Sequence, residues 1–543
     1  MRRHLLSLLC LVAAFIGVVS AQSNPAGRAG QADALGEATS SPTKPVAQAR
    51  SISFAKPVVY SSGGWAASSL ATADLNRDGY LDIVVANRCP SPGNCANGEV
   101  SVLLGNSDGT FQPAVSYNSG GAGGGFVAVS DLNGDGKLDL VITTACPNYS
   151  CVSVLLGNGD GTFQAAVTYY SGGYEPTSAA IGDVNGDGIP DLVVSNACSV
   201  AGQNCQNGLV DGTIGVLVGN GDGTFQAVVS YDAGAYDANA VALGDLTGDG
   251  SLDVVVGALC PAAEFFNGCV AVFLNNGDGS FQPPATFLTF QRPGGATSLR
   301  ITDLNGDGVP DVAMSNLSGG VGVLLGNGDG TFQNVALYGS GGAGGSYSIA
   351  IGDVNGDGIP DLIAGNLCRT FTRAATCAGA SNVGVLVGNG NGTFQDAISY
   401  NSGGSTPTSI AIGDVNGDGK PDLIVANDCS STCETGTIGV LLNKTARAPT
   451  TTTLTSSPNP SQVNQLVTFT ATITSSRFVP DGQAVQFYDG TALIGTGSTE
   501  KGVATLLTSF SKAKTYAIKA KYAGGGFLGA SSGTVKQKVV NQE

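Results

Sequence analysis

Histidine, tryptophan and methionine are nearly missing from this chain of 543 residues, which holds one, one and two of them. The single histidine, His4, lies in an N-terminal stretch that we expect to be removed as a signal peptide, residues 1–21. Without it, the mature chain has no histidine general base, no Ser-His-Asp triad and no histidine metal ligand. The lack of histidine excludes histidine-dependent catalysis.

Charged residues are also scarce, at 12% of the chain, whereas 82 glycines indicate many turns. No segment keeps a helical period of apolar residues for long, so an all-β fold is favoured. The net charge of -17 does not indicate a basic partner, because seven loops described below contain three aspartates each. Seven bound Ca²⁺ ions would change the net charge from -17 to -3. We therefore expect no nucleic-acid partner and no membrane insertion.

A nine-residue pattern, D-x-N-x-D-G-x-x-D, occurs seven times, with Thr247 replacing the asparagine in the fourth copy. Alternating side-chain oxygens converge when the chain curls tightly, as in the calcium loop of an EF-hand, and glycine permits that curl. Calcium accepts six to eight oxygens in flexible geometry, whereas magnesium requires a stricter octahedron. The pattern predicts up to seven Ca²⁺ sites. The alternative is that these residues merely form turns.

Positions 1, 3, 5 and 9 of each copy supply oxygen side chains, and position 7 supplies only its backbone carbonyl consistently. The predicted metal ligands are Asp74, Asn76, Asp78, Tyr80 and Asp82; Asp131, Asn133, Asp135, Lys137 and Asp139; Asp183, Asn185, Asp187, Ile189 and Asp191; Asp245, Thr247, Asp249, Ser251 and Asp253; Asp303, Asn305, Asp307, Val309 and Asp311; Asp353, Asn355, Asp357, Ile359 and Asp361; Asp414, Asn416, Asp418, Lys420 and Asp422.

The N-terminal segment predicts export. Residues 1–21 have a basic start, an apolar run from Leu5 to Val19 and a small-residue cleavage site ending at Ala21. Residues 22–50 are rich in Ala, Gly, Ser, Pro and Gln, which is typical of a disordered linker. We expect a protein that is secreted or held at the cell surface.

Twelve cysteines follow the predicted signal peptide, and they fall into six close couples, each after one aspartate loop. In an exported chain this even, local pairing predicts six disulfides. Zinc is the competing interpretation, but the spacings vary and no histidine accompanies them. The couples are Cys89/Cys95, Cys146/Cys151, Cys198/Cys205, Cys260/Cys269, Cys368/Cys377 and Cys429/Cys433.

From Ser51 a unit of 50 to 62 residues recurs, which indicates a propeller or a solenoid. Each unit predicts four antiparallel strands, with aspartate loops and glycine turns on one face and cysteine loops on the other. In the sixth unit we expect strands at Ser348–Gly352, Leu362–Asn366, Val383–Val387 and Thr393–Tyr400, with a glycine turn at 388–392.

The ends of the repeat region predict a closed ring. The seventh unit stops after its third strand, at Leu442-Asn443. Its missing fourth strand reappears at the start, because Phe54, Val58 and Tyr60 repeat the apolar spacing of the other fourth strands. Such pairing removes an open sheet edge. We therefore predict a seven-bladed β-propeller over residues 51–443.

Residues 444–449 form a predicted link, and residues 450–543 have a different composition without aspartate loops or cysteine. Alternating stretches indicate an immunoglobulin-like β-sandwich of about seven strands. The clearest stretches are Val467–Thr474, Ala484–Tyr488, Val503–Ser509 and Tyr516–Tyr522.

At the aspartate loops the sequence resembles FG-GAP repeats, the units of integrin alpha-subunit propellers and of secreted bacterial proteins described as FG-GAP or VCBS-type. Val241–Asp245 and Asp253–Ala258 illustrate the match, which covers about residues 52–443. The resemblance implies a seven-bladed propeller with calcium between the first and second strands of each blade. The tail looks like bacterial Ig-like repeats. No transmembrane segment or partner subunit is visible, so integrin-type ligand binding does not transfer.

Three functions stay open at this point. The first is a calcium-binding adhesion module whose long cysteine loops, Cys198–Thr213 and Cys368–Val383, hold a protein or glycan. The second is a glycosidase or polysaccharide lyase on a propeller scaffold. The third is a structural envelope or matrix protein. We expect no enzyme, because most aspartates lie in the loops and the leftover carboxylates are expected to be solvated loop residues, namely Glu99, Glu175, Glu264 and Glu434.

Overall fold

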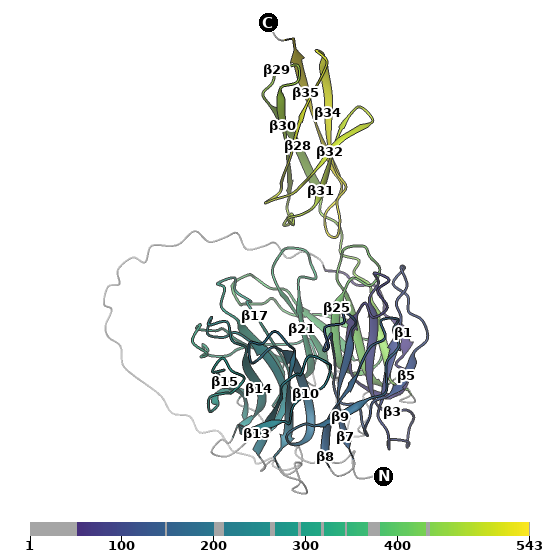
Figure 1. The fold of residues 1–543 in the computed structure, drawn as a ribbon, viewed down its shortest axis with the longest axis vertical. Coiled ribbons are helices and arrows are strands. Elements are labelled where there is room, and N and C mark those ends of the chain that lie inside the picture. The colour runs from purple at the N-terminus through teal and green to yellow at the C-terminus, as the bar shows by residue number, and fades with distance from the viewer. Residues whose placement is uncertain are drawn as a thin grey trace, which may run out of the picture. The chain divides into compact units, whose positions relative to one another are not determined.

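The computed structural model describes residues 52–541, apart from 147–148, 200–210, 261–266, 291–294, 317–319, 343–344, 368–380 and 430–434. All the regular secondary structure in these described residues is β-strand (Figure 1). The all-β prediction is therefore confirmed. The predicted signal peptide and linker, residues 1–50, lie outside the described residues.

The repeat region forms seven groups of four antiparallel strands. The first two groups are β2 (Trp65–Ala73), β3 (Asp82–Cys89), β4 (Glu99–Leu103) and β5 (Val115–Asn118), then β6 (Val127–Ser130), β7 (Asp139–Cys146), β8 (Tyr149–Leu155) and β9 (Val167–Tyr170). The fifth and sixth are β17 (Ala296–Thr302), β18 (Asp311–Asn316), β19 (Gly320–Leu324) and β20 (Ala336–Tyr338), then β21 (Ser346–Gly352), β22 (Asp361–Asn366), β23 (Asn382–Leu386) and β24 (Ile398–Asn401).

The third and fourth groups share one strand. β13 (Val229–Gly244) is the fourth strand of the third group and continues, through irregular pairing between Tyr236 and Ala240, as the first strand of the fourth. The strand runs on through the connection between the two groups, where Gly234 and Asp237 have positive φ of 62° and 53°. The other strands are β10 (Tyr174–Gly182), β11 (Asp191–Cys198), β12 (Asp211–Leu217), β14 (Asp253–Cys260), β15 (Asn267–Phe273) and β16 (Ala285–Phe290).

The seventh group is completed by the N-terminal strand, as predicted. It contains β25 (Ser405–Gly413), β26 (Asp422–Cys429) and β27 (Thr437–Leu441), and β1 (Val58–Ser61) pairs with the outer edge of β27. The register places Val58 opposite Val440 and Tyr60 opposite Ile438. Phe54 adds an antiparallel bridge to Asn443.

The first strands of successive groups contact one another in cyclic order, and β25 and β26 contact β2. At that junction the Thr408 hydroxyl donates a hydrogen bond to the Ala67 carbonyl at 2.8 Å. The seven groups therefore close a ring, the arrangement of a β-propeller.

Aromatic pairs pack across all seven interfaces between neighbouring groups. In each pair an aromatic residue on the fourth strand of one group meets the edge of a phenylalanine in the next group, at centroid distances of 5.2 to 5.7 Å. The fourth strands begin later than predicted: β24 starts at Ile398 instead of Thr393, because Phe394 only bridges back to Gly388. The pairs are Phe54/Tyr400, Tyr60/Phe111, Tyr117/Phe163, Tyr169/Phe225, Tyr231/Phe281, Phe287/Phe332 and Tyr338/Phe394.

The C-terminal region is a sandwich of a three-stranded and a five-stranded sheet around a core that includes Phe469, Phe487 and Tyr522. It has eight strands instead of about seven, because the two-residue β29 adds a short parallel pairing. One sheet is β28 (Thr450–Ser457), β30 (Leu466–Ser475) and β33 (Val503–Ser509); the other is β29 (Ser461–Gln462), β35 (Ser531–Val540), β34 (Thr515–Tyr522), β31 (Ala484–Asp489) and β32 (Ala492–Ser498).

Three of the six predicted disulfides are confirmed: Cys89–Cys95, Cys146–Cys151 and Cys260–Cys269, with Cα separations of 4.5 to 5.8 Å. Cys198 and Cys429 are also disulfide-bonded. Their predicted partners, and both members of the Cys368/Cys377 couple, lie outside the described residues. Across the described part of the chain, no helix is long and apolar enough to cross a membrane.

Deleting Ser51–Tyr60 should open the ring. The deletion exposes the edge of β27 and leaves the Phe111 and Tyr400 rings without their partners. An open apolar edge pairs with other chains, so we expect aggregation, measured by size-exclusion chromatography with light scattering. The control deletes residues 22–50 and should stay monodisperse. Equal behaviour of the two truncations would contradict closure by β1.

The remaining cysteines should follow the same local pairing. Non-reducing peptide mapping of the exported protein should find Cys198–Cys205, Cys368–Cys377 and Cys429–Cys433, because each couple is close in sequence and resembles the three bonds already seen. Free thiols, or bonds that join different groups of the ring, would show that the pairing is wrong.

Candidate metal centre

The aspartate loops lie where the sequence predicted them, between the first and second strands of all seven groups. In the third group, Asp183 directly follows β10, and Asp191 is the first residue of β11. The loop between them is exposed at its tip and buried at its end. The structure therefore brings positions 1 to 9 of each loop together in one hairpin connection.

The first aspartate of the loop stabilises the curled backbone conformation. Asp183 accepts hydrogen bonds from the backbone N–H groups of Gly186 at 2.7 Å, Asp187 at 3.1 Å and Gly188 at 2.7 Å. Gly186 and Gly188 have φ of +77° and +82°, a region that favours glycine. The backbone thus favours glycine at both positions, independently of any metal, although Arg77 takes the first of them in the first loop at φ 60°.

Positions 3 and 5 contact each other. Asn185 accepts a hydrogen bond from the Asp187 N–H at 3.0 Å and donates one to the Asp187 carboxylate at 2.9 Å. The other oxygen of Asp187 accepts from the Ile189 N–H at 2.8 Å. These side chains use their oxygens inside the loop, as turn-forming residues do.

The ninth aspartate has a role that the sequence analysis missed. Asp191 is 0% exposed, and its two oxygens accept from the N–H groups of Val184 at 2.9 Å and Gly219 at 2.8 Å. Gly219 follows the third strand, so this carboxylate joins the aspartate loop to the next turn. The same pair of bonds is made by Asp82, Asp139, Asp253, Asp311, Asp361 and Asp422.

Burial raises the pKa of the ninth aspartate in every group, and the carboxylates at positions 5 and 1 raise it further. The amide hydrogen bonds act in the opposite direction. The pKa reaches about 8 at Asp361 and about 6 at Asp422. The ninth carboxylate is therefore harder to ionise than a free aspartate.

The sixth and seventh loops are more enclosed than the others. Phe527 lies against Gly356, and Arg447 donates a hydrogen bond to the Asp418 carbonyl at 3.2 Å. Asn355 is buried and donates to both oxygens of Asp361 at 3.3 Å. This cover excludes water and explains why the pKa is raised most at Asp361.

Few cations offset the charge of these loops. The second and seventh loops each contain a lysine–aspartate ion pair, Lys137–Asp135 at 3.0 Å and Lys420–Asp418 at 3.7 Å. Within the described residues, the aspartates of the first, third, fourth and fifth loops have no ion pair with lysine or arginine. A bound divalent cation would supply the missing positive charge.

The donor set fits calcium in its chemistry, because the predicted ligands are oxygens and include three carboxylates. The positions of the side chains differ from a coordination sphere. Over the described residues, no group of three or more His, Cys, Asp or Glu side chains is gathered so that it could hold a metal ion. In the third loop, for example, the Asn185 amide would have to turn away from Asp187.

A second polar turn recurs after the third strands. In the second group Asn158 donates to the Thr162 hydroxyl at 2.8 Å, and Asp160 accepts from the N–H and hydroxyl of Thr162. The hydroxyl lowers the pKa of Asp160. The recurring letters N-x-D-G-T could have identified this turn from the sequence. Its residues form a hydrogen-bonded turn.

The glutamates outside the aspartate loops only partly match the prediction that they are solvated loop residues. Glu99 is 8% exposed in β4, so the prediction of a solvated loop residue is wrong, because the third strands lie inside their sheets. Glu175 is exposed, but it belongs to β10. Glu264 and Glu434 lie outside the described residues.

Comparison with known families gives three matches. An FG-GAP-like repeat matches residues 93–142, 131–194, 263–314, 303–364 and 375–425, and an FG-GAP repeat matches residues 66–103. A bacterial Ig-like domain (group 3) matches residues 454–540. These ranges fall on the ring and on the C-terminal sandwich described above.

Curated relatives include phosphatidylinositol-glycan-specific phospholipase D of Bos taurus, 32% identical over 183 residues, which are 28% of this chain and 20% of the relative. The Mus musculus enzyme is 30% identical over 190 residues, or 30% of this chain and 21% of the relative. The chain thus spans about a fifth of the length of these relatives.

Similar solved structures include the Dos1 propeller, with a TM-score of 0.39, 14% identity and coverage of 71% of this chain and 95% of that one. The V. cholerae biofilm matrix protein Bap1 has a TM-score of 0.29 and 12% identity, with coverage of 70% and 88%.

Substitutions in the third loop should separate the two roles of its aspartates. In chelator, Asp191→Ala should lower the free energy of unfolding by about 2–6 kcal/mol, because two buried N–H groups lose their acceptor. Asp187→Ala removes an exposed acceptor and should cost less than about 1 kcal/mol. Urea unfolding of both variants measures the difference, and equal costs would contradict the structural role of the ninth aspartate.

Proposed function

We propose that this chain, which carries FG-GAP-like repeats and a C-terminal bacterial Ig-like domain, is an exported binding module. Calcium in its aspartate loops would stabilise the ring, and the ring would hold a protein or glycan partner for adhesion. We propose binding instead of catalysis. The observation that supports the calcium part is the buried ninth aspartate of every group, which shares its loop with two further carboxylates that raise its pKa.

Calcium would be held by the side-chain oxygens at positions 1, 3, 5 and 9 and by the backbone carbonyl at position 7. When bound, the ion supplies positive charge to three carboxylates that otherwise repel one another. The ninth aspartate already joins its loop to the following turn. An ion on this carboxylate would therefore strengthen the connection between the aspartate loop and the turn after the third strand.

Export is supported by the disulfides. Cys89–Cys95, Cys146–Cys151 and Cys260–Cys269 are formed, and such bonds persist in oxidising compartments. The basic and apolar residues 1–21 agree with secretion to the medium or the cell surface. A partner outside the cell follows from this location.

Binding is supported by the contrast between constant and variable loops within each repeat. The aspartate loops and glycine turns are nearly identical from group to group, whereas the cysteine loops differ in length and sequence. Variable loops on a rigid scaffold commonly carry recognition. The phospholipase relatives share about a fifth of their length with this chain, and their activity is not part of the proposal.

Calcium should raise the melting temperature of the mature protein. Binding to the native state alone stabilises it by about 2.7 kcal/mol per site at a free concentration of 100 times Kd. Differential scanning fluorimetry in calcium, in magnesium and in chelator measures the effect, and Asp418→Ala should reduce the gain without unfolding the protein. Identical melting curves in chelator and in excess calcium would contradict the metal sites.

The binding role is tested with the mature, calcium-loaded protein on a glycan array and on a panel of extracellular matrix proteins. We expect saturable binding to at least one class of partner, weakened by chelator, and no change in the partner's covalent structure. Release of reducing ends or unsaturated sugars would instead favour the polysaccharide-acting enzyme. Absence of binding to every array component would contradict the role.

A further inference from the structure

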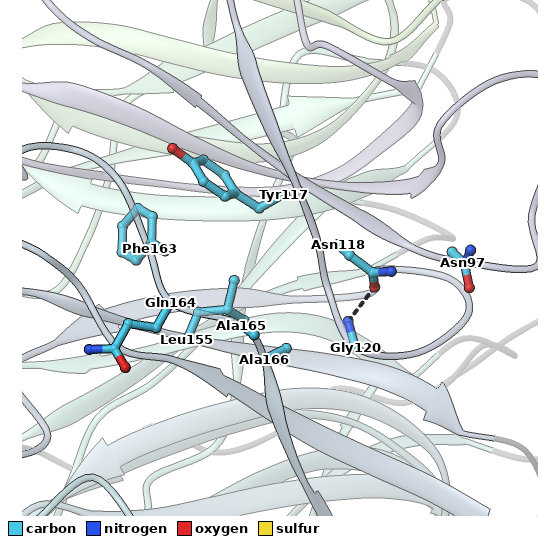
Figure 2. A pocket seen from close by; sticks show the side chains of 9 residues that line it. All are labelled: Asn97, Tyr117, Asn118, Gly120, Leu155, Phe163, Gln164, Ala165 and Ala166. Carbon is cyan, nitrogen blue, oxygen red and sulfur yellow. Dashed lines mark hydrogen bonds between the residues drawn. The ribbon is translucent and has the colours of Figure 1, made fainter.

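A pocket of about 410 Å³ opens between the first group, β2–β5, and the second, β6–β9 (Figure 2). Its walls come from the end of β5, the residues after Phe163 and the segment that follows the Cys89–Cys95 loop. This volume lies within the ordinary range of small-molecule sites, about 300–1,000 Å³.

The residues beside the phenylalanine are smaller at this interface than at the others. Every interface has an edge-on aromatic pair, but the residues two and three after the phenylalanine differ. Here they are Ala165 and Ala166, the smallest combination in the ring. At each other interface at least one of the two residues is larger: Pro113/Ala114, Ala227/Val228, Pro283/Pro284, Asn334/Val335, Asp396/Ala397 and Lys56/Pro57.

The lining is uncharged and combines amides with aromatic rings. Asn118 accepts a hydrogen bond from the Gly120 N–H at 2.8 Å through its side-chain oxygen, so its NH₂ group is available to a ligand. Asn97 is exposed beside it. In the view of Figure 2 the two alanines lie between these amides and the ring of Phe163, whose edge-on partner Tyr117 is 5.7 Å away.

We propose that this pocket binds a neutral pyranose of a glycan. An asparagine amide offers a donor and an acceptor side by side, which suits two neighbouring hydroxyls. Phe163 is only 9% exposed and Tyr117 is half-buried, so the apolar C–H face of a sugar ring would lie on Ala165, Ala166 and the accessible part of Tyr117. The pocket has no cationic side chain for a uronate and no carboxylate for a basic peptide. This inference rests on the proposed binding role and names the ligand class.

Ala166→Val tests the pocket by filling it with the residue that the third and fifth groups carry at the same position, Val228 and Val335. The matched control, Ala397→Val, makes the same change in the sixth group. Both variants should fold, because valine is accommodated at this position elsewhere in the ring. Asn97→Ala, at an exposed side chain, tests the polar side of the pocket.

The probes are the methyl glycosides of glucose, galactose, mannose and N-acetylglucosamine, measured by saturation-transfer NMR and calorimetry with the full mature chain in calcium. We expect binding of at least one, weakened about tenfold or more by Ala166→Val and several-fold by Asn97→Ala, with no change in Ala397→Val. Melting curves of all variants should coincide.

Binding that Ala166→Val leaves unchanged would overturn this pocket and leave the proposed function standing. Binding of methyl glucuronide or a protein, with none of the neutral glycosides, would overturn the ligand class. If the full glycan and protein panel also fails, the proposed function falls together with the inference.

Discussion

A buried aspartate held by two backbone N–H groups is the constraint on which the ring depends. Asp191 and its six counterparts are buried, yet their surroundings raise the pKa and make ionisation costly. Each carboxylate joins the loop after the first strand to the turn after the third. Removing it would leave two donors unsatisfied. The structural role of the ninth aspartate is therefore enough to explain why it recurs in every loop.

The aromatic residues at the interfaces of the ring recur in every group, whereas the residues next to them vary. Seven edge-to-face aromatic pairs fix the distance between neighbouring groups, and the last pairs depend on Phe54 and Tyr60 from the N-terminal strand. The residues after each phenylalanine are less restricted. Between the first and second groups they are Ala165 and Ala166, which line a pocket beside an intact aromatic contact.

The fold was largely predictable because its signals are local and repeated. The aspartate loops, three of the cysteine pairs and the closure by Phe54, Val58 and Tyr60 follow from spacing alone. The shared strand β13 was missed, although its connection reads Ala-Gly-Ala at 233–235 where others, such as 171–173 and 402–404, read Ser-Gly-Gly. The second role of Asp191 was also missed, because its partner Gly219 is distant in sequence and contributes only a backbone N–H. The pocket was missed as well, because its lining comes from segments that are far apart in the sequence, such as Asn97, Tyr117 and Ala166.

Calcium in the aspartate loops is the central claim, and counting the ions tests it most directly. Native mass spectrometry of the mature chain, loaded with calcium and then freed of excess metal, reports the number bound to each folded molecule. The account predicts discrete binding of up to seven ions, and one fewer when the ninth aspartate of a single loop is replaced by asparagine. A chain that retains no calcium beyond the background of a metal-free control protein would contradict it.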